Sequence, residues 1–340
     1  MKRFQLLRKR GGHWVLSRSR PRPIIGFFLL VLTSSILLFF TLLNALSEHL
    51  VAFIVFLPFV AFFAYVLVRE FNQALNTSNS YFLFSRPASY DFIATFIGAV
   101  LTYLISQGAG TGAVVASGLI GVLAALLVPS YGVPVFCGSF FGMCAHALFG
   151  VFPFMIGALI ASMVFVVTKD VMNGFGGKLG TIAFTPALFI PLIFEGGFLA
   201  GDRYGIQEGA ALVVASVLGA VLTYLISIRL TRGPVFASGF IGLLSGLVLP
   251  IVFGSFGGTL AVAAFGASFV GMSSPERLKD ERFIMLGGLM FGLIFVFSAP
   301  YFTGSGGKLG TIAFVSAIMF HGLLLLFPRV KSLKERKGNG

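Results

Sequence analysis

One nine-residue stretch occurs twice in this chain and constrains its fold more than any other feature. Residues Gly176 to Phe184 read GGKLGTIAF, and the same nine letters return from Gly306 to Phe314. Each copy follows a further glycine, at position 174 or 304, and leads into a long apolar segment. A glycine-rich turn that carries one lysine therefore opens an apolar helix twice, which indicates an internal duplication.

Shorter matches in the same order extend the duplication on the N-terminal side of each copy. The octapeptide AVLTYLIS at 99–106 recurs at 220–227, and ASGLIG at 116–121 recurs as ASGFIG at 237–242. GSFFGM at 138–143 then corresponds to ASFVGM at 267–272. Because the order is preserved throughout, we interpret the pattern as a tandem duplication of roughly 110 residues.

The composition places the duplicated chain in a membrane. Hydrophobic residues make up 57% of the 340 residues and charged residues only 10%, whereas charged residues make up about a quarter of a soluble domain. A membrane span needs about 20 mostly apolar residues, so the chain has room for roughly a dozen. The predicted fold is an all-α polytopic membrane protein with about 12 transmembrane helices.

The predicted organisation has five parts: a basic cytoplasmic tail at 1–22, two spans and a polar linker at 23–90, repeat 1 at 91–208, repeat 2 at 209–328, and a second basic cytoplasmic tail at 329–340. The first two spans are placed at 23–46 and 50–69. Those of repeat 1 are placed near 91–107, 112–129, 133–149, 153–169 and 180–199. Those of repeat 2 are placed near 210–228, 234–251, 256–273, 283–300 and 309–328.

Five crossings per repeat is an odd number, which would place the two repeats in opposite orientations across the membrane. The alternative is that the third segment, glycine-rich and short at 133–149, enters and leaves by the same side, which would make the repeats parallel. Cytoplasmic segments are enriched in Lys and Arg, and the inverted arrangement puts more of these residues inside. It places Lys169, Lys178, Arg229 and Arg232 inside, and Arg203 outside beside Glu195, Asp202 and Glu208.

The two glycine-rich turns are the predicted binding sites. Glycines before a helix let backbone N–H groups converge, and the helix N-terminus carries partial positive charge, so the turn suits an anion or a polar group. Lys178 and Lys308 would add a full charge at opposite mouths. The alternative is that the glycines allow close packing while the lysine extends to the membrane interface. The turn is not a nucleotide-binding loop, because leucine follows each lysine. The residues assigned to the two turns are Gly176, Gly177 and Lys178 in repeat 1 and Gly306, Gly307 and Lys308 in repeat 2.

Hydroxyl side chains recur at matching positions inside apolar segments. The pairs Thr181 with Thr311 and Ser139 with Ser268 are candidates for lining a path. The alternative for such residues is a hydrogen bond between helices, which contributes ~0.6 kcal/mol on average in membrane proteins. We assign both pairs to the predicted binding site.

Other patterns limit the possible functions. The carboxylates fall at or near span ends, which argues against an ion-coupled pump with a carboxylate in mid-membrane. His146 and His321 lie within apolar stretches, where a lone histidine more often bonds to a neighbouring helix. We expect no enzyme, no catalytic residue, no metal and no cofactor.

The net charge of +13 is concentrated in the two tails, where it favours cytoplasmic termini and anionic lipid over nucleic acid.

We therefore expect an integral protein of a bacterial inner membrane that acts as a channel or facilitative transporter for a small polar or anionic solute. The arrangement is similar to that of the urea-transporter-like proteins, in which duplicated five-span units are inverted about a central path. The alternatives are a non-transporting scaffold or subunit of a larger membrane complex, and a flippase for an anionic lipid-linked head group. A homo-oligomer is also compatible with this sequence.

Overall fold

The computed structural model describes the backbone of residues 5–10, 13–18, 21–76, 85–108, 110–194 and 197–338, and the side chains within 22–75, 85–108, 110–194 and 197–326. Four features of the sequence prediction lie outside these residues: part of the polar linker (77–84), the acidic Glu195, the charged side chains of the N-terminal tail before Arg22, and those of the C-terminal tail.

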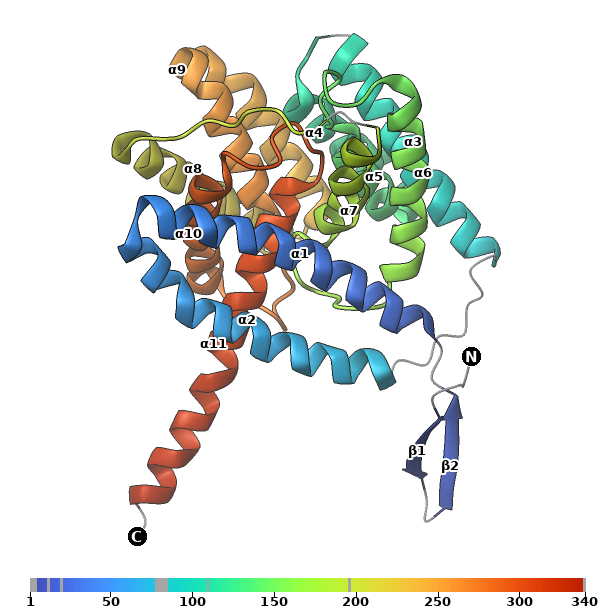
Figure 1. Ribbon diagram of the computed structural model, residues 1–340, viewed down its shortest axis with the longest axis vertical. Helices are drawn as coiled ribbons and strands as arrows, with labels where there is room; N and C mark the ends of the chain where they lie inside the picture. The colour runs from blue at the N-terminus through green and yellow to red at the C-terminus, as the bar shows by residue number, and fades with distance from the viewer. Residues whose placement is uncertain are drawn as a thin grey trace.

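The fold is helical, and eight helices in the described part have the length and apolarity of membrane spans. The first two are α1 (Pro21–Glu48) and α2 (Leu50–Asn76), which agree with the spans expected at 23–46 and 50–69. They form a hairpin along one side of the other helices (Figure 1). Before them, strands β1 (Gln5–Arg10) and β2 (His13–Arg18) pair antiparallel within the predicted basic tail.

Each repeat contributes a similar series of helical segments. Repeat 1 contains α3 (Arg86–Gly108), α4 (Ala113–Leu127), the 3₁₀ turn η1 (Pro129–Tyr131), α5 (Gly132–Gly142), α6 (Val151–Thr168) and α7 (Lys178–Ile193). Repeat 2 contains α8 (Ile206–Tyr224), the π-helical turn η2 (Leu225–Arg229), α9 (Pro234–Gly271), α10 (Glu281–Ser298) and α11 (Lys308–Gly338). Helix α11 continues through the segment predicted as a separate C-terminal tail.

The second and third segments of each repeat form a helical hairpin. Helix α9 reverses at Gly254, whose φ of 60° and ψ of −138° are not helical. A hydrogen bond of 2.7 Å then joins the hydroxyls of Ser238 and Ser268 across the two arms. In repeat 1, α4 and α5 are joined in the same way by Ser117 and Ser139 at 2.8 Å. These hairpins correspond to the second and third predicted spans.

The third segment of repeat 1 is shorter than predicted. The expected helix over 133–149 ends at Gly142, because the chain then turns and the N–H of Ala145 donates to the carbonyl of Gly304 in repeat 2. An 11-residue helix is about 16 Å long, well short of the ~30 Å hydrocarbon thickness. The count of twelve spans and the inverted arrangement therefore remain predictions.

Helices α7 and α11 form the centre of the molecule and meet where each begins. A Cβ atom added to Gly180 would lie 2.4 Å from the Cα of Gly310, and one added to Gly310 would lie 2.4 Å from the Cα of Gly180. Gly177 likewise lies against the backbone N of Phe314, and Gly307 against that of Phe184. The first two turns of the two helices are thus in direct backbone contact.

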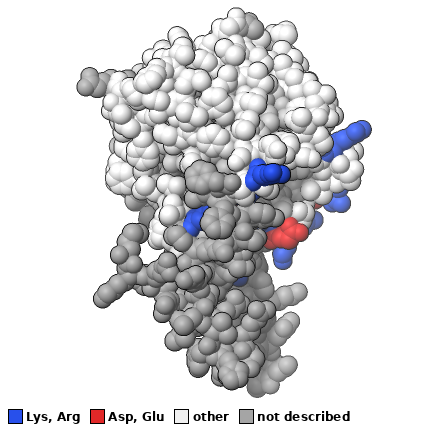
Figure 2. All heavy atoms as spheres, turned by 90° about the vertical axis from the view of Figure 1, so that its right-hand side faces the viewer, with Lys and Arg blue, Asp and Glu red and all other residues white. Residues whose placement is uncertain are grey.

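Charge is unevenly distributed between the two ends of the helices. Arg22 and Glu48 lie at opposite ends of α1, and each forms an ion pair with a residue of another segment. We call the two ends the Asp91 end and the Glu48 end. Among the described side chains, the ion pairs at the Asp91 end are Lys169–Asp91, Arg22–Asp170, Arg277–Glu70 and Arg229–Glu281, and the pair at the Glu48 end is Arg203–Glu48. On the face shown in Figure 2, the charged atoms of the described residues gather in a narrow zone, and the white surface above that zone shows no charged atoms.

Candidate functional site

The duplicated turns have the same backbone conformation in both repeats. Gly174 and Gly304 have φ values of 84° and 83°, and Gly177 and Gly307 have φ values of 84° and 86°. This left-handed region is readily adopted by glycine and costs other residues energy. These four glycines are thus required by the turn itself, independently of any ligand.

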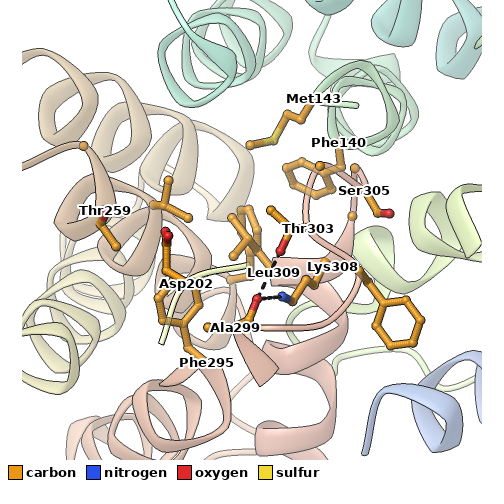
Figure 3. A pocket seen from close by; sticks show the side chains of 18 of the residues that line it. Phe140, Met143, Asp202, Thr259, Phe295, Ala299, Thr303, Ser305, Lys308 and Leu309 are labelled. Atoms are coloured by element: carbon orange, nitrogen blue, oxygen red, sulfur yellow. Dashed lines mark hydrogen bonds between the residues drawn. The ribbon is translucent and has the colours of Figure 1, made fainter. Parts of the chain in front are cut away.

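The side chain of Lys308 is directed at the end of the preceding helix. Its Nζ donates to the carbonyl oxygens of Tyr301 at 2.6 Å, Ser298 at 2.8 Å and Ala299 at 3.5 Å, and Figure 3 shows the contact with Ala299. Ser298 and Ala299 end α10, where the last carbonyls have no partner within the helix and carry partial negative charge. The buried ammonium therefore caps α10.

Lys178 has the equivalent position in repeat 1. Its Nζ donates to the carbonyl oxygen of Lys169, at the C-terminal end of α6, at 3.0 Å. It also donates to Oδ1 of Asn173 at 2.6 Å. Both lysines are thus buried and hydrogen-bonded within the protein, a geometry that differs from the interface-seeking lysine considered from the sequence. Their role in binding an anion stays a prediction.

Replacing these lysines with methionine is expected to destabilise the protein. Hydrogen bonds to charged groups contribute about 1.5–3 kcal/mol each, so Lys308→Met should lower the free energy of unfolding by about 3 kcal/mol. Lys178→Met should cost less, about 2 kcal/mol, because Asn173 is exposed and its amide can bond to water instead. Thermal denaturation of the purified variants in detergent measures the effect.

The control for this experiment is Lys279→Met, which removes an exposed charge and should leave the denaturation curve unchanged. Normal thermal stability of both Lys178→Met and Lys308→Met would contradict the capping role. If those stable variants also lost transport, the result would assign the two ammonium groups to binding of the solute.

Each turn docks on the opposite repeat. The backbone N–H of Gly176 donates to the hydroxyl of Ser273 at 3.0 Å, and that of Gly306 donates to Sγ of Cys144 at 3.2 Å. Cys144 and Ser273 both directly follow a Gly-Met pair that the two repeats share. Cys144 was not among the predicted site residues, although this shared position was a usable signal for its role.

Two cavities border the two turns. The Lys308 cavity has a volume of ≈ 450 Å³ and is lined by the Gly306–Lys308 turn together with residues of α9, α10 and the loop before α8. The Lys178 cavity has a volume of ≈ 260 Å³ and is lined by the Gly176–Lys178 turn together with Lys169 and Asn173. The first lies toward the Glu48 end and the second toward the Asp91 end. Gly176, Gly177, Gly306 and Gly307 therefore all border a cavity, as do both lysines.

Phe140 of α5 and Phe269 of α9 are the residues that line both cavities in the described part of the chain. Their ring centroids are 4.5 Å apart, and they occupy matching positions of the two repeats. Phe136 and Phe265, one helical turn earlier, complete the cluster at 4.5 Å from Phe140 and 4.8 Å from Phe269. We call these four side chains the phenyl barrier, because its central pair, Phe140 and Phe269, lines both cavities and the other two rings pack against that pair.

The predicted hydroxyl residues lie away from the cavities and bond to protein groups. Ser139 and Ser268 join the arms of the two helical hairpins and also donate to the carbonyls of Phe136 and Phe265. The hydroxyls of Thr181 and Thr311 donate to the carbonyls of Gly177 and Gly307 at 3.4 and 3.3 Å. The serine contacts match the alternative of hydrogen bonds between helices, whereas each threonine bonds to the start of its own helix. A role of the four residues in solute binding stays a prediction.

The mouth of the Lys308 cavity contains polar residues that the sequence did not single out. Asp202 and Tyr204 come from the loop before α8, and Thr259 and Thr303 come from α9 and the turn after α10. Figure 3 labels Asp202, Thr259 and Thr303. Burial, together with the nearby Asp202 carboxylate, raises the pKa of Tyr204 to about 12. The Tyr204 hydroxyl thus stays neutral and able to donate a hydrogen bond at physiological pH.

We compared the chain with known protein families, curated proteins and solved structures. The chain matches no protein-family model, no curated protein and no solved structure.

Proposed function

We propose that this protein is a channel or facilitative transporter whose solute passes between the Lys178 cavity and the Lys308 cavity. The observation that carries the proposal is the position of Phe140 and Phe269. These two repeat-related rings separate two cavities that lie toward opposite ends of the helices, and each cavity borders one copy of the duplicated turn. Two half-paths meeting at a central barrier are the arrangement that inverted repeats generate.

Reciprocal contacts support an inverted arrangement of the repeats. The Gly180–Gly310 contact, the two serine-linked hairpins and the docking of each turn on the other repeat all occur as matching pairs. The turns before α7 and α11 also reach toward opposite ends: Lys178 bonds to the end of α6, beside Arg22, and Lys308 bonds to the end of α10, beside Asn44. A parallel arrangement would place both turns at the same end.

The distribution of charge supports a cytoplasmic location for the Asp91 end. This end contains most of the described Lys and Arg side chains that form ion pairs, and the chain enters α1 there from its basic N-terminal segment. Positive residues are enriched on the cytoplasmic side of membrane proteins. We therefore place the Lys178 cavity on the cytoplasmic side of a bacterial inner membrane and the Lys308 cavity on the outer side.

The lining of the barrier favours equilibrative movement over pumping. The groups between the cavities are phenyl rings, and the carboxylate that lines the Lys308 cavity, Asp202, lies in a loop at its mouth. Ion-coupled transporters commonly use a carboxylate deep in the membrane. We expect flux down the solute gradient to persist when the proton and sodium gradients are dissipated.

Single cysteines at Asn173 and Thr303 test both topology and path. The two positions match between the repeats and line different cavities. We expect Asn173→Cys to react with a membrane-impermeant maleimide from the cytoplasmic side and Thr303→Cys to react from the outer side. A bulky adduct at Thr303 should also reduce solute flux into proteoliposomes by at least about tenfold, because it fills the mouth.

The wild-type protein is the labelling control, since Cys137 and Cys144 are fully buried and should not react. Labelling of both introduced cysteines from one side would contradict the inverted path. Full labelling at Thr303 without loss of flux would contradict passage through the Lys308 cavity.

A flippase is the second candidate, and one observation favours it. Tyr204 lines the Lys308 cavity and also a ≈ 980 Å³ groove whose wall is mostly apolar and is formed by α1, α2, α8 and α10. A polar cavity beside an apolar groove suits a lipid with a polar head group. Movement of a fluorescent anionic phospholipid between leaflets of the same proteoliposomes would favour this function over solute flux.

A further inference from the structure

We infer that the solute is a small uncharged polar molecule, and that the phenyl barrier excludes ions. This inference rests on the proposed path between the two cavities and identifies the class of molecule that can use it. This class of solute is narrower than the class expected from the sequence, which included anionic as well as polar molecules.

The barrier itself provides the first argument. Phe136, Phe140, Phe265 and Phe269 are nearly completely buried and pack with their ring centroids 4.5–6.5 Å apart. An ion crossing such a cluster loses its hydration and gains no opposite charge, whereas a neutral molecule loses only a few hydrogen bonds. Hydrophobic constrictions of this kind block ions in channels by excluding water.

The lysines provide the second argument, because their hydrogen bonds are directed inward. Lys308 donates to three backbone carbonyls and Lys178 to one carbonyl and one amide oxygen. A monovalent anion would have to draw either ammonium away from the end of its helix. The duplicated lysines thus shape the turns and leave little positive charge available for an anionic solute.

Most of the remaining polar groups suit a neutral solute. The charged exceptions are Lys169, which is paired with Asp91 at 2.6 Å, and Asp202 at the mouth of the Lys308 cavity. The Lys308 cavity presents hydroxyls from Tyr204, Ser255, Thr259 and Thr303, and the Lys178 cavity presents the side chain of Asn173. Hydroxyl and amide groups both donate and accept hydrogen bonds, so they can replace water around a molecule such as an amide or a polyol. The barrier between the cavities then selects for small size and absence of net charge.

Stopped-flow measurements on proteoliposomes test the inference with named probes. Urea and glycerol are the uncharged probes, and potassium formate and methylammonium chloride are the charged ones. We expect the uncharged probes to equilibrate at least about fivefold faster in wild-type vesicles than in vesicles with maleimide-blocked Thr303→Cys protein. For the charged probes, we expect the two vesicle types to be equal, and a planar bilayer containing the wild-type protein should show no ionic current.

The possible failures are distinguishable. Protein-dependent flux of formate or methylammonium, or an ionic current, would overturn the uncharged-solute inference and leave the path intact. Rates for all four probes equal to those of blocked and empty vesicles would overturn the path itself, and with it the proposed function.

Discussion

Valine at position 180 or 310 is expected to prevent accumulation of folded protein. A Cβ atom at either glycine would lie 2.4 Å from the Cα of the other, where both neighbours are backbone and cannot rotate away. Separating α7 from α11 would also disturb the turns that contact the other repeat. We expect a loss of more than about 4 kcal/mol, at the severe end of overpacking changes.

Size-exclusion chromatography of detergent-solubilised fusions to a fluorescent protein provides the measurement, with a monodisperse peak expected for the wild type and for neither valine variant. The matched control is Gly209→Ala in α8, where the nearest atoms to the new methyl group are 3.8 Å away. This change should be neutral or slightly stabilising, because alanine favours helix over glycine. Well-folded Gly180→Val or Gly310→Val protein would refute the close crossing of the two helices.

The double variant Phe140→Ala, Phe269→Ala is expected to admit ions. It removes the two rings that face both cavities, which should join them into a continuous polar space. We expect an ionic current at least about tenfold above that of the wild type, because water can then accompany an ion between the cavities. Phe140→Ala alone and Phe269→Ala alone should each give a smaller current than the double variant. The two smaller currents should be similar, since the two residues occupy matching positions.

The matched control is Phe141→Ala, the next residue of α5. Its side chain is equally buried but packs against Phe149 and Phe154 and lines neither cavity. It should therefore cost stability, as other buried phenylalanine truncations do, without producing a current. A current in the control, or none in a folded double variant, would show that the phenyl barrier does not separate the two sides.

The helical character and the positions of most helices could be predicted from the sequence. Long apolar runs specify spans strongly, because a membrane leaves few alternatives for the backbone. The exact repeat at 176–184 and 306–314 also located the two turns that border the cavities. The end of α5 could not be predicted, because Ala145 turns toward Gly304, a partner 159 residues later in the chain.

The roles of the site residues were harder to predict for the same reason. A lysine after two glycines has the same sequence pattern whether it faces a solute or a helix end. Lys308 faces the helix end because the carbonyls of Ser298 and Tyr301 accept its hydrogen bonds, and these carbonyls lie near Lys308 only after the turn has formed. The repeat alignment did contain Phe140 and Phe269 at matching positions, but aromatic residues are so common in this chain that the pair did not stand out.

The exchange of contacts between the turns and the opposite repeat bears on the origin and folding of the chain. Gly176 obtains its acceptor from Ser273, which is synthesised almost 100 residues later, so the first half cannot complete its structure alone. Gly306 depends in the same way on Cys144. In the inverted arrangement proposed above, an unduplicated ancestor would have needed a second copy, inserted in the opposite orientation, to supply these acceptors. In that case, gene fusion would have converted an antiparallel homodimer into one polypeptide and freed position 144 to differ from position 273.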